Sequence, residues 1–195
     1  MIIHIDGVQG SGKSWLCNKL LKLNNIVCID TDDINKLALD ELQKDKNFAK
    51  IRNVKSATKK LAIKMISIRD ELIQLYGNKD DKLLIFAGMT LPIINADLKY
   101  FIKITKFEDT YRKLMFREFT KFFDNKREIF KIIKNDDVKF VNFNIEQLTN
   151  ISVNIPISYE DFLNDYTERL NDAKKNGYQP CSQKDIYIIL KEISR

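Results

Sequence analysis

The chain opens on a glycine-rich loop set between an apolar run and an amphipathic run. Residues 7–14 read GVQGSGKS, which has the spacing G-x-x-x-x-G-K-[ST] of a phosphate-binding loop. Before this loop, isoleucines dominate residues 2–5, as in a short strand buried inside a parallel sheet. After it, leucines recur at steps of three and four over residues 16–23. The stretch therefore predicts a loop that joins a buried strand to a helix.

Each residue type in this loop suits an anionic ligand. Glycines permit positive φ and let the backbone approach the ligand closely, while the N–H groups at the start of a helix face an anion. In this pattern the lysine reaches the β- and γ-phosphates and the hydroxyl binds Mg²⁺. We therefore expect a nucleoside triphosphate and Mg²⁺ to bind here, with these residues as contacts: Gly7, Gly10, Ser11, Gly12, Lys13 and Ser14.

Length and composition favour one intracellular α/β domain. The 195 residues are enough to bury a core without help from disulfides or metals. No apolar run approaches the length of a membrane span, and no basic leader precedes the first strand, so we expect a soluble cytoplasmic protein without a membrane partner. The bias toward Lys, Ile and Asn is typical of AT-rich genomes, among them viral ones. The expected location therefore includes the host cytoplasm, in case the protein is viral.

The formal net charge of +6 comes mainly from lysines scattered among acids. Such a surface suits small anions as well as nucleic acid. Only residues 121–134 are locally basic, and their interleaved apolar side chains favour a helix with its lysines in water over a nucleic-acid stripe.

The cysteines and the single histidine indicate structural rather than chemical roles. Cys17, Cys28 and Cys181 are odd in number and show no C-x-x-C spacing, which argues against a disulfide framework. The first two fall in a predicted helix and a predicted strand, where we expect small buried side chains. His4 has no partners at zinc-ligand spacing, so we expect a buried, hydrogen-bonded histidine.

Strands separated by helices predict a parallel sheet with helices on both faces. The expected fold class is α/β, with about five parallel strands in the middle of three layers, and the whole of residues 1–195 forms one domain. Expected strands after the first are 26–30, 82–87, 99–104 and, in a stretch with weak patterns, 151–155. One helix is expected to follow the second strand and to end near residue 48. Further helices are expected over 53–77, 107–123, 158–175 and 183–194.

An acidic run, DTDD, follows the second predicted strand. Ligands of parallel sheets bind at the carboxyl ends of the strands, so these side chains should lie near the phosphate loop. We expect Asp30 to support the metal and Asp32 to orient an acceptor or accept its proton. Asp33 is the expected cap of the next helix.

With these features the chain resembles the small-molecule kinase group of the P-loop NTPase superfamily, which includes adenylate-kinase-like and shikimate-kinase-like enzymes. The resemblance rests on GVQGSGKS, on DTD after the second strand, on IFAG after the third, and on an arginine-bearing helix after the fourth. It implies a three-layer P-loop NTPase fold with a lid near residues 107–134. It also implies that the lid arginines, Arg112 and Arg117, contact the transferred phosphate together with Lys13 and Asp32.

The leading hypothesis is an ATP- and Mg²⁺-dependent kinase of a small acceptor, most simply a nucleoside or nucleotide. A second is a kinase of nucleic-acid ends or of a protein-bound acceptor, held by the basic segment 121–134. A third is an ATP-binding regulatory module without catalysis. GNKDD at 77–81 resembles the N-K-x-D element with which GTPases bind guanine. It precedes a predicted strand instead of following one, which disfavours a GTPase.

Overall fold

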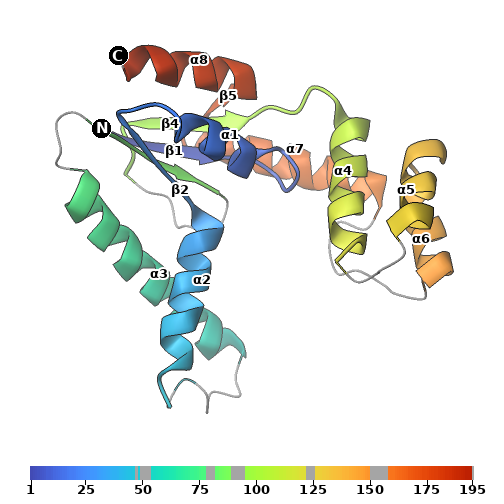
Figure 1. The fold of residues 1–195 in the computed structure, drawn as a ribbon, viewed down its shortest axis with the longest axis horizontal. Helices are drawn as coiled ribbons and strands as arrows, with labels where there is room; N and C mark the ends of the chain where they lie inside the picture. The colour runs from blue at the N-terminus through green and yellow to red at the C-terminus, as the bar shows by residue number, and fades with distance from the viewer. Residues whose placement is uncertain are drawn as a thin grey trace.

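The computed structural model describes residues 1–46, 48, 54–77, 82–88, 95–121, 126–149 and 158–194. Its centre is one sheet in which all neighbouring strands are parallel, in the order β2-β3-β1-β4-β5 (Figure 1). The strand that precedes the glycine-rich loop therefore lies in the middle of the sheet. The strands are β1 (Ile2–Asp6), β2 (Ile26–Asp30), β3 (Leu83–Ala87), β4 (Leu98–Ile102) and β5 (Gln179–Cys181).

Helices connect the strands and cover the sheet. Among the described residues the first four are α1 (Lys13–Leu20), α2 (Thr31–Gln43), α3 (Val54–Tyr76) and α4 (Phe107–Phe119). The remaining four are α5 (Lys126–Asn135), α6 (Val141–Thr149), α7 (Tyr159–Lys175) and α8 (Gln183–Ile193).

Two apolar clusters hold helices on opposite faces of the sheet. On one face, α1 and α8 bury Leu16, Ile186 and Leu190 against the strands. On the other face, α2 and α3 bury Ile34 and Met65 against β3. Together with the parallel sheet these clusters make the three-layer α/β arrangement that the sequence predicted (Figure 1).

A third cluster joins helices that extend beyond the sheet. Figure 1 shows α4, α5 and α6 to one side of the sheet. Tyr111 of α4 is fully buried in this cluster, which also contains side chains from α5, α6 and α7, and its ring contacts that of Phe162. The cluster reaches the sheet through Phe101 of β4. The predicted lid, residues 107–134, thus contributes α4 and α5, which rest on a core of their own.

Two predicted elements differ in the structure. The fifth strand is Gln179–Cys181, whereas the candidate at 151–155 lies outside the described residues. β5 is an edge strand of three residues, where Pro180 is tolerated because one side needs no ladder hydrogen bonds. A strand of three residues is too short to show an alternation of apolar and polar residues in the sequence. The helix expected to reach residue 48 ends at Gln43, and most of the 77–81 loop lies outside the described residues.

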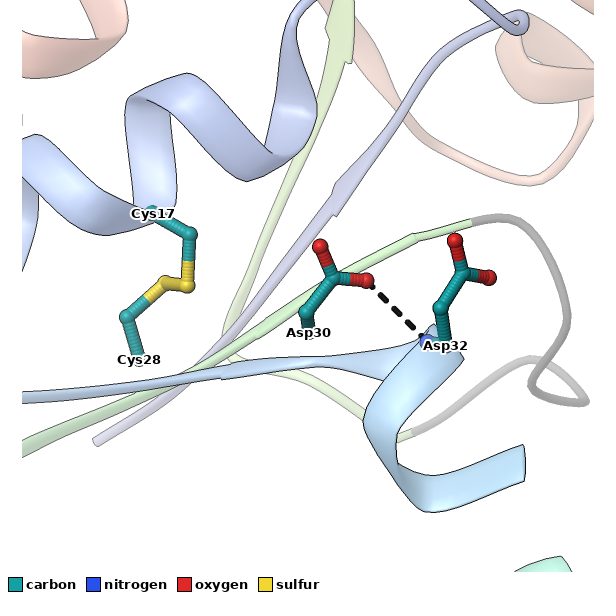
Figure 2. The surroundings of a disulfide bond; sticks show 4 residues. All are labelled: Cys17, Cys28, Asp30 and Asp32. Atoms are coloured by element: carbon teal, nitrogen blue, oxygen red, sulfur yellow. Dashed lines mark hydrogen bonds between the residues drawn. A yellow bond between two sulfur atoms is a disulfide. The ribbon is translucent and has the colours of Figure 1, made fainter. Parts of the chain in front are cut away.

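Cys17 and Cys28 are buried, as expected, but the expectation that they form no disulfide is wrong. The structure joins them in a disulfide between α1 and β2, with their Cα atoms 5.5 Å apart (Figure 2). Because α1 packs on the face of the sheet to which Cys28 points, the two side chains meet across the layer. Cys181 is the free cysteine.

We expect reduction of this disulfide to lower the free energy of unfolding by about 2–3 kcal/mol, because it closes a short loop in the unfolded chain. Urea unfolding with and without reductant measures this difference in the free energy of unfolding. Cys181→Ser is the matched control, because it removes the free cysteine and should show the same difference. Thiol titration of the unfolded, unreduced chain should find one free cysteine. Three free thiols in that titration would contradict the disulfide.

His4 is buried in β1 and fully hydrogen-bonded, as expected. Its Nδ1 meets the hydroxyl of Tyr178, and its Nε2 lies 3.2 Å from the carbonyl oxygen of Gly88. A carbonyl only accepts, so Nε2 carries the proton and Nδ1 accepts from the tyrosine. Burial lowers the pKa of His4, which keeps the ring neutral. His4 therefore links β1 to the residue that follows β3 and to the residue that precedes β5.

Candidate nucleotide-binding site

The glycine-rich loop has the backbone that the sequence predicted. It connects β1 to α1, and Gly10 and Gly12 have φ of 77° and 84°, in the left-handed region that favours glycine. Gly12 is the N-cap of α1, and no side chain caps this helix. The first N–H groups of a helix have no partner within it, so they are available to an anion in front of the loop.

Gln183, at the start of α8, contacts the glycine-rich loop. Its side-chain amide donates to the carbonyl oxygen of Ser11. A Cβ atom on Gly12 would lie 2.0 Å from the same amide nitrogen, so a larger residue there would displace the Gln183 side chain from the loop. The hydroxyl of Ser11 is buried without a hydrogen-bond partner in the described part of the chain. A buried hydroxyl without a partner is costly, and it fits a loop that is completed by a ligand.

Lys13 folds back onto the loop. Its Nζ donates to the carbonyl oxygens of Gly7 and Val8, at 2.5 and 2.9 Å. Burial lowers the pKa of Lys13 to about 8, and the carboxylate of Asp6, at the end of β1, opposes that shift. The ammonium is thus held in a poorly hydrated place, where a phosphate would be a better partner than water.

A cavity of about 310 Å³ lies in front of the loop. The loop and the first turn of α1 contribute Gln9, Gly10, Gly12, Lys13, Ser14 and Trp15 to its wall. Three charged side chains come from elsewhere: Asp30 and Asp32 at the β2 to α2 junction, and Arg117 of α4. We call this space the phosphate cavity. It gathers one lysine, one hydroxyl, two carboxylates and one arginine from three segments of the chain.

The two carboxylates leave the junction in the same general direction (Figure 2). Asp30 is the N-cap of α2, and its carboxylate accepts a hydrogen bond from the backbone N–H of Asp32 at 3.0 Å. The capping role predicted for Asp33 therefore belongs to Asp30, because the helix begins three residues earlier than that assignment requires. Asp33 is exposed in the first turn and is absent from the cavity wall.

The two predicted lid arginines point to different places. Residues five apart lie about 140° apart around a helix, and α4 is continuous over both. Arg117 lines the phosphate cavity and is paired with the buried Glu118 at 2.7 Å. Burial alone would raise the pKa of Glu118, but hydrogen bonds from Lys121 and Arg117 outweigh it and lower that pKa. Arg112 instead donates to the carbonyl oxygens of Ile133 and Asp136, so it fastens α4 to the end of α5.

Sequence reasoning missed three residues at this site. Asp6 directly precedes the first glycine, and that position was its only signal. Trp15, the sole tryptophan, is 53% exposed on the cavity wall, with Lys19 Nζ 4.3 Å from its ring centroid. Gln183 lies far along the chain, and only the folding of α8 beside the loop reveals it.

Gly88 directly follows β3, where the resemblance placed a glycine. A Cβ atom there would lie 1.6 Å from the hydroxyl oxygen of Thr31, the buried first residue of α2. The glycine thus lets α2 begin close against the end of β3. This close approach places the β2 to α2 junction, with both carboxylates, next to the loop.

A glycine-rich loop of this spacing after the central strand of a five-stranded parallel sheet, with helices on both faces, is the arrangement of the three-layer P-loop NTPase fold. No protein-family model matches the chain, and no curated protein matches it in sequence. Among solved structures it is similar to thymidylate kinase from Candida albicans, with 13% identity and a TM-score of 0.41. That alignment covers 98% of this chain and 89% of the other. The function is therefore inferred from the site's own residues.

The described residues contain no helix that is both long and apolar enough to cross a membrane.

Proposed function

We propose that this protein is an ATP- and Mg²⁺-dependent phosphotransferase whose acceptor is a small molecule, a nucleoside or a nucleotide. The observation that carries the proposal is the phosphate cavity, which collects Lys13, Ser14, Asp30, Asp32 and Arg117 around one space. Phosphoryl transfer needs positioning and charge neutralisation rather than covalent chemistry by the protein, and these are the groups that supply both. The setting we propose is intracellular, where ATP is present.

The residues present fit a bound nucleotide and metal. The uncapped start of α1, the hydroxyl of Ser11 and the poorly hydrated Nζ of Lys13 all suit phosphate oxygens. Mg²⁺ in such sites is held by one or two protein oxygens together with phosphates and waters, and Ser14 and Asp30 are the protein oxygens on the cavity wall. When bound, the metal neutralises charge on the phosphate oxygens.

In the proposed reaction the acceptor hydroxyl attacks the γ-phosphorus. A new oxygen–phosphorus bond forms, the bond to the β-phosphate oxygen breaks, and ADP leaves. Asp32 orients the hydroxyl and accepts its proton, while Lys13 and Arg117 balance the charge on the moving group. The carboxylate of Asp30 is already occupied in part by the N–H of Asp32, which makes Asp32 the freer base.

Asp32→Asn should lower the rate of transfer roughly 10²–10⁴-fold, because it removes the proton acceptor but keeps the shape of the side chain. Asp33→Asn is the matched control, since it makes the same change one residue away, outside the cavity, and should stay within about twofold. The measurement is steady-state formation of phosphorylated acceptor with a pool of nucleosides and nucleotides. Equal rates for Asp32→Asn and the unaltered protein would remove Asp32 from the mechanism.

A further inference from the structure

Two exposed phenylalanines on the far side of α4 form a groove separate from the phosphate cavity. Phe116 of α4 and Phe130 of α5 meet edge to face, with ring centroids 5.9 Å apart, and are 37% and 51% exposed. They line a space of about 440 Å³ together with Ile133, and the lysines 113 and 134 stand on its wall. We call this space the phenylalanine groove. It offers flat apolar faces between cations.

A second, polar groove borders both the phenylalanine groove and the phosphate loop. It has a volume of about 300 Å³ and shares Asp109 and Lys113 with the phenylalanine groove. It shares Gly10 with the phosphate cavity. Its other cations are Lys103, Lys106 and Lys184.

The two neighbouring grooves, which we call the track, have mostly positive charge on their walls. Asp109 is the acid on the walls of the two grooves, and Lys106 faces it at 4.0 Å. The lysines at 103, 113, 134 and 184 have no ion pair among the salt bridges of the described residues. The track thus presents unbalanced cations along its length and aromatic faces at its outer end.

We propose that the track, from Lys103 and Lys184 to Phe116, Phe130 and Lys134, binds single-stranded nucleic acid. Lysines along a groove match a phosphodiester backbone, and exposed aromatic rings stack bases irrespective of sequence. An acidic peptide would satisfy the lysines and leave the phenylalanine faces in water, and an apolar helix would satisfy the faces but bury the lysines. A single strand satisfies both parts of the track.

The test measures binding of a fluorescein-labelled single strand of thymidylate to the full chain by fluorescence anisotropy, without ATP. The double variant Phe116→Ala with Phe130→Ala should weaken binding about tenfold or more, because stacking of each base on an aromatic ring contributes strongly. The control is Phe140→Ala with Phe143→Ala, which removes two exposed rings outside the track and should change binding less than about twofold.

A salt titration separates the lysines of the track from general charge. Replacing Lys113 and Lys134 by Gln should reduce the slope of log Kd against log salt by about 0.7 for each lysine that contacts a phosphate. Replacing Lys22 and Lys174 by Gln gives the same net charge and should leave the slope unchanged. An equal reduction of the slope in the two double variants would overturn the proposal. So would displacement of the labelled strand by polyglutamate as effectively as by the unlabelled strand. Displacement of that kind would point to an acidic polypeptide. The readout is independent of phosphotransfer, so it can succeed or fail separately from the proposed function.

Discussion

Lys13→Met should abolish phosphotransfer and yet make the protein without nucleotide more stable. The loss of transfer is expected to be roughly 10²–10³-fold or more, because the variant loses the cation that faces the transferred phosphate. The gain in stability follows from the same burial. The folded pKa of about 8 lies below the ordinary 10.5, so at neutral pH the folded chain bears the cost of holding the ammonium away from water.

That cost is about 3 kcal/mol when the pKa shift is converted to free energy. Methionine also loses the two hydrogen bonds to Gly7 and Val8, at about 1 kcal/mol each, so the net gain is about 1–2 kcal/mol. The sign with pH is definite. The penalty is complete below the folded pKa of 8, fades as pH rises from 8 to 10.5, and vanishes once the amine is neutral in both states.

Urea unfolding of both proteins at about pH 7 and above about pH 10 measures this difference. We expect the variant to be the more stable at the lower pH and the advantage to shrink at the higher pH. A variant that is less stable at about pH 7 would mean that water reaches the Lys13 ammonium freely.

Arg117→Ala and Arg112→Ala should separate catalysis from stability on one helix. Arg117 lies in the phosphate cavity, where loss of an arginine that balances the transferred group costs roughly 10³-fold in kcat or more. Arg112 holds two backbone carbonyls at the end of α5 instead. Its loss leaves those carbonyls without a charged donor and should lower the free energy of unfolding by about 2–3 kcal/mol.

The measurement is kcat with saturating ATP and acceptor, together with urea unfolding, for both variants. Arg117→Ala should change stability little, since its side chain is half exposed and its partner Glu118 keeps Lys121 at 2.7 Å. If Arg112→Ala lowered kcat as far as Arg117→Ala without a loss of stability, both arginines would act on the phosphate, as the kinase resemblance implied.

Local patterns predicted the half of the molecule that holds the loop. The isoleucines of residues 2–5 and the leucines of α1 have periods that follow directly from burial in a sheet and on one helix face, and GVQGSGKS has a spacing set by its ligand. The start of the helix expected over 158–175 is also confirmed: α7 begins at Tyr159, and Ser158 and Asp161 make both hydrogen bonds of its capping box.

Features that depend on distant parts of the chain could not be read in this way. The disulfide forms because α1 lies over β2, and the odd cysteine count concealed it. Gln183 reaches the loop from the other end of the chain, and β5 is too short to carry a period. The roles of Arg112 and Arg117 were separable only by the direction of each side chain, which the placement of α5 and α6 against α4 decides.

The direct test of phosphotransfer is phosphorus NMR of ATP and Mg²⁺ with the protein, alone and with pooled nucleosides, nucleotides and small hydroxy acids. We expect a new phosphorylated product and ADP, both dependent on the acceptor and both lost in Lys13→Ala. ATP that binds but is never consumed, or that yields only inorganic phosphate with every acceptor, would contradict the assignment of this cavity to phosphotransfer.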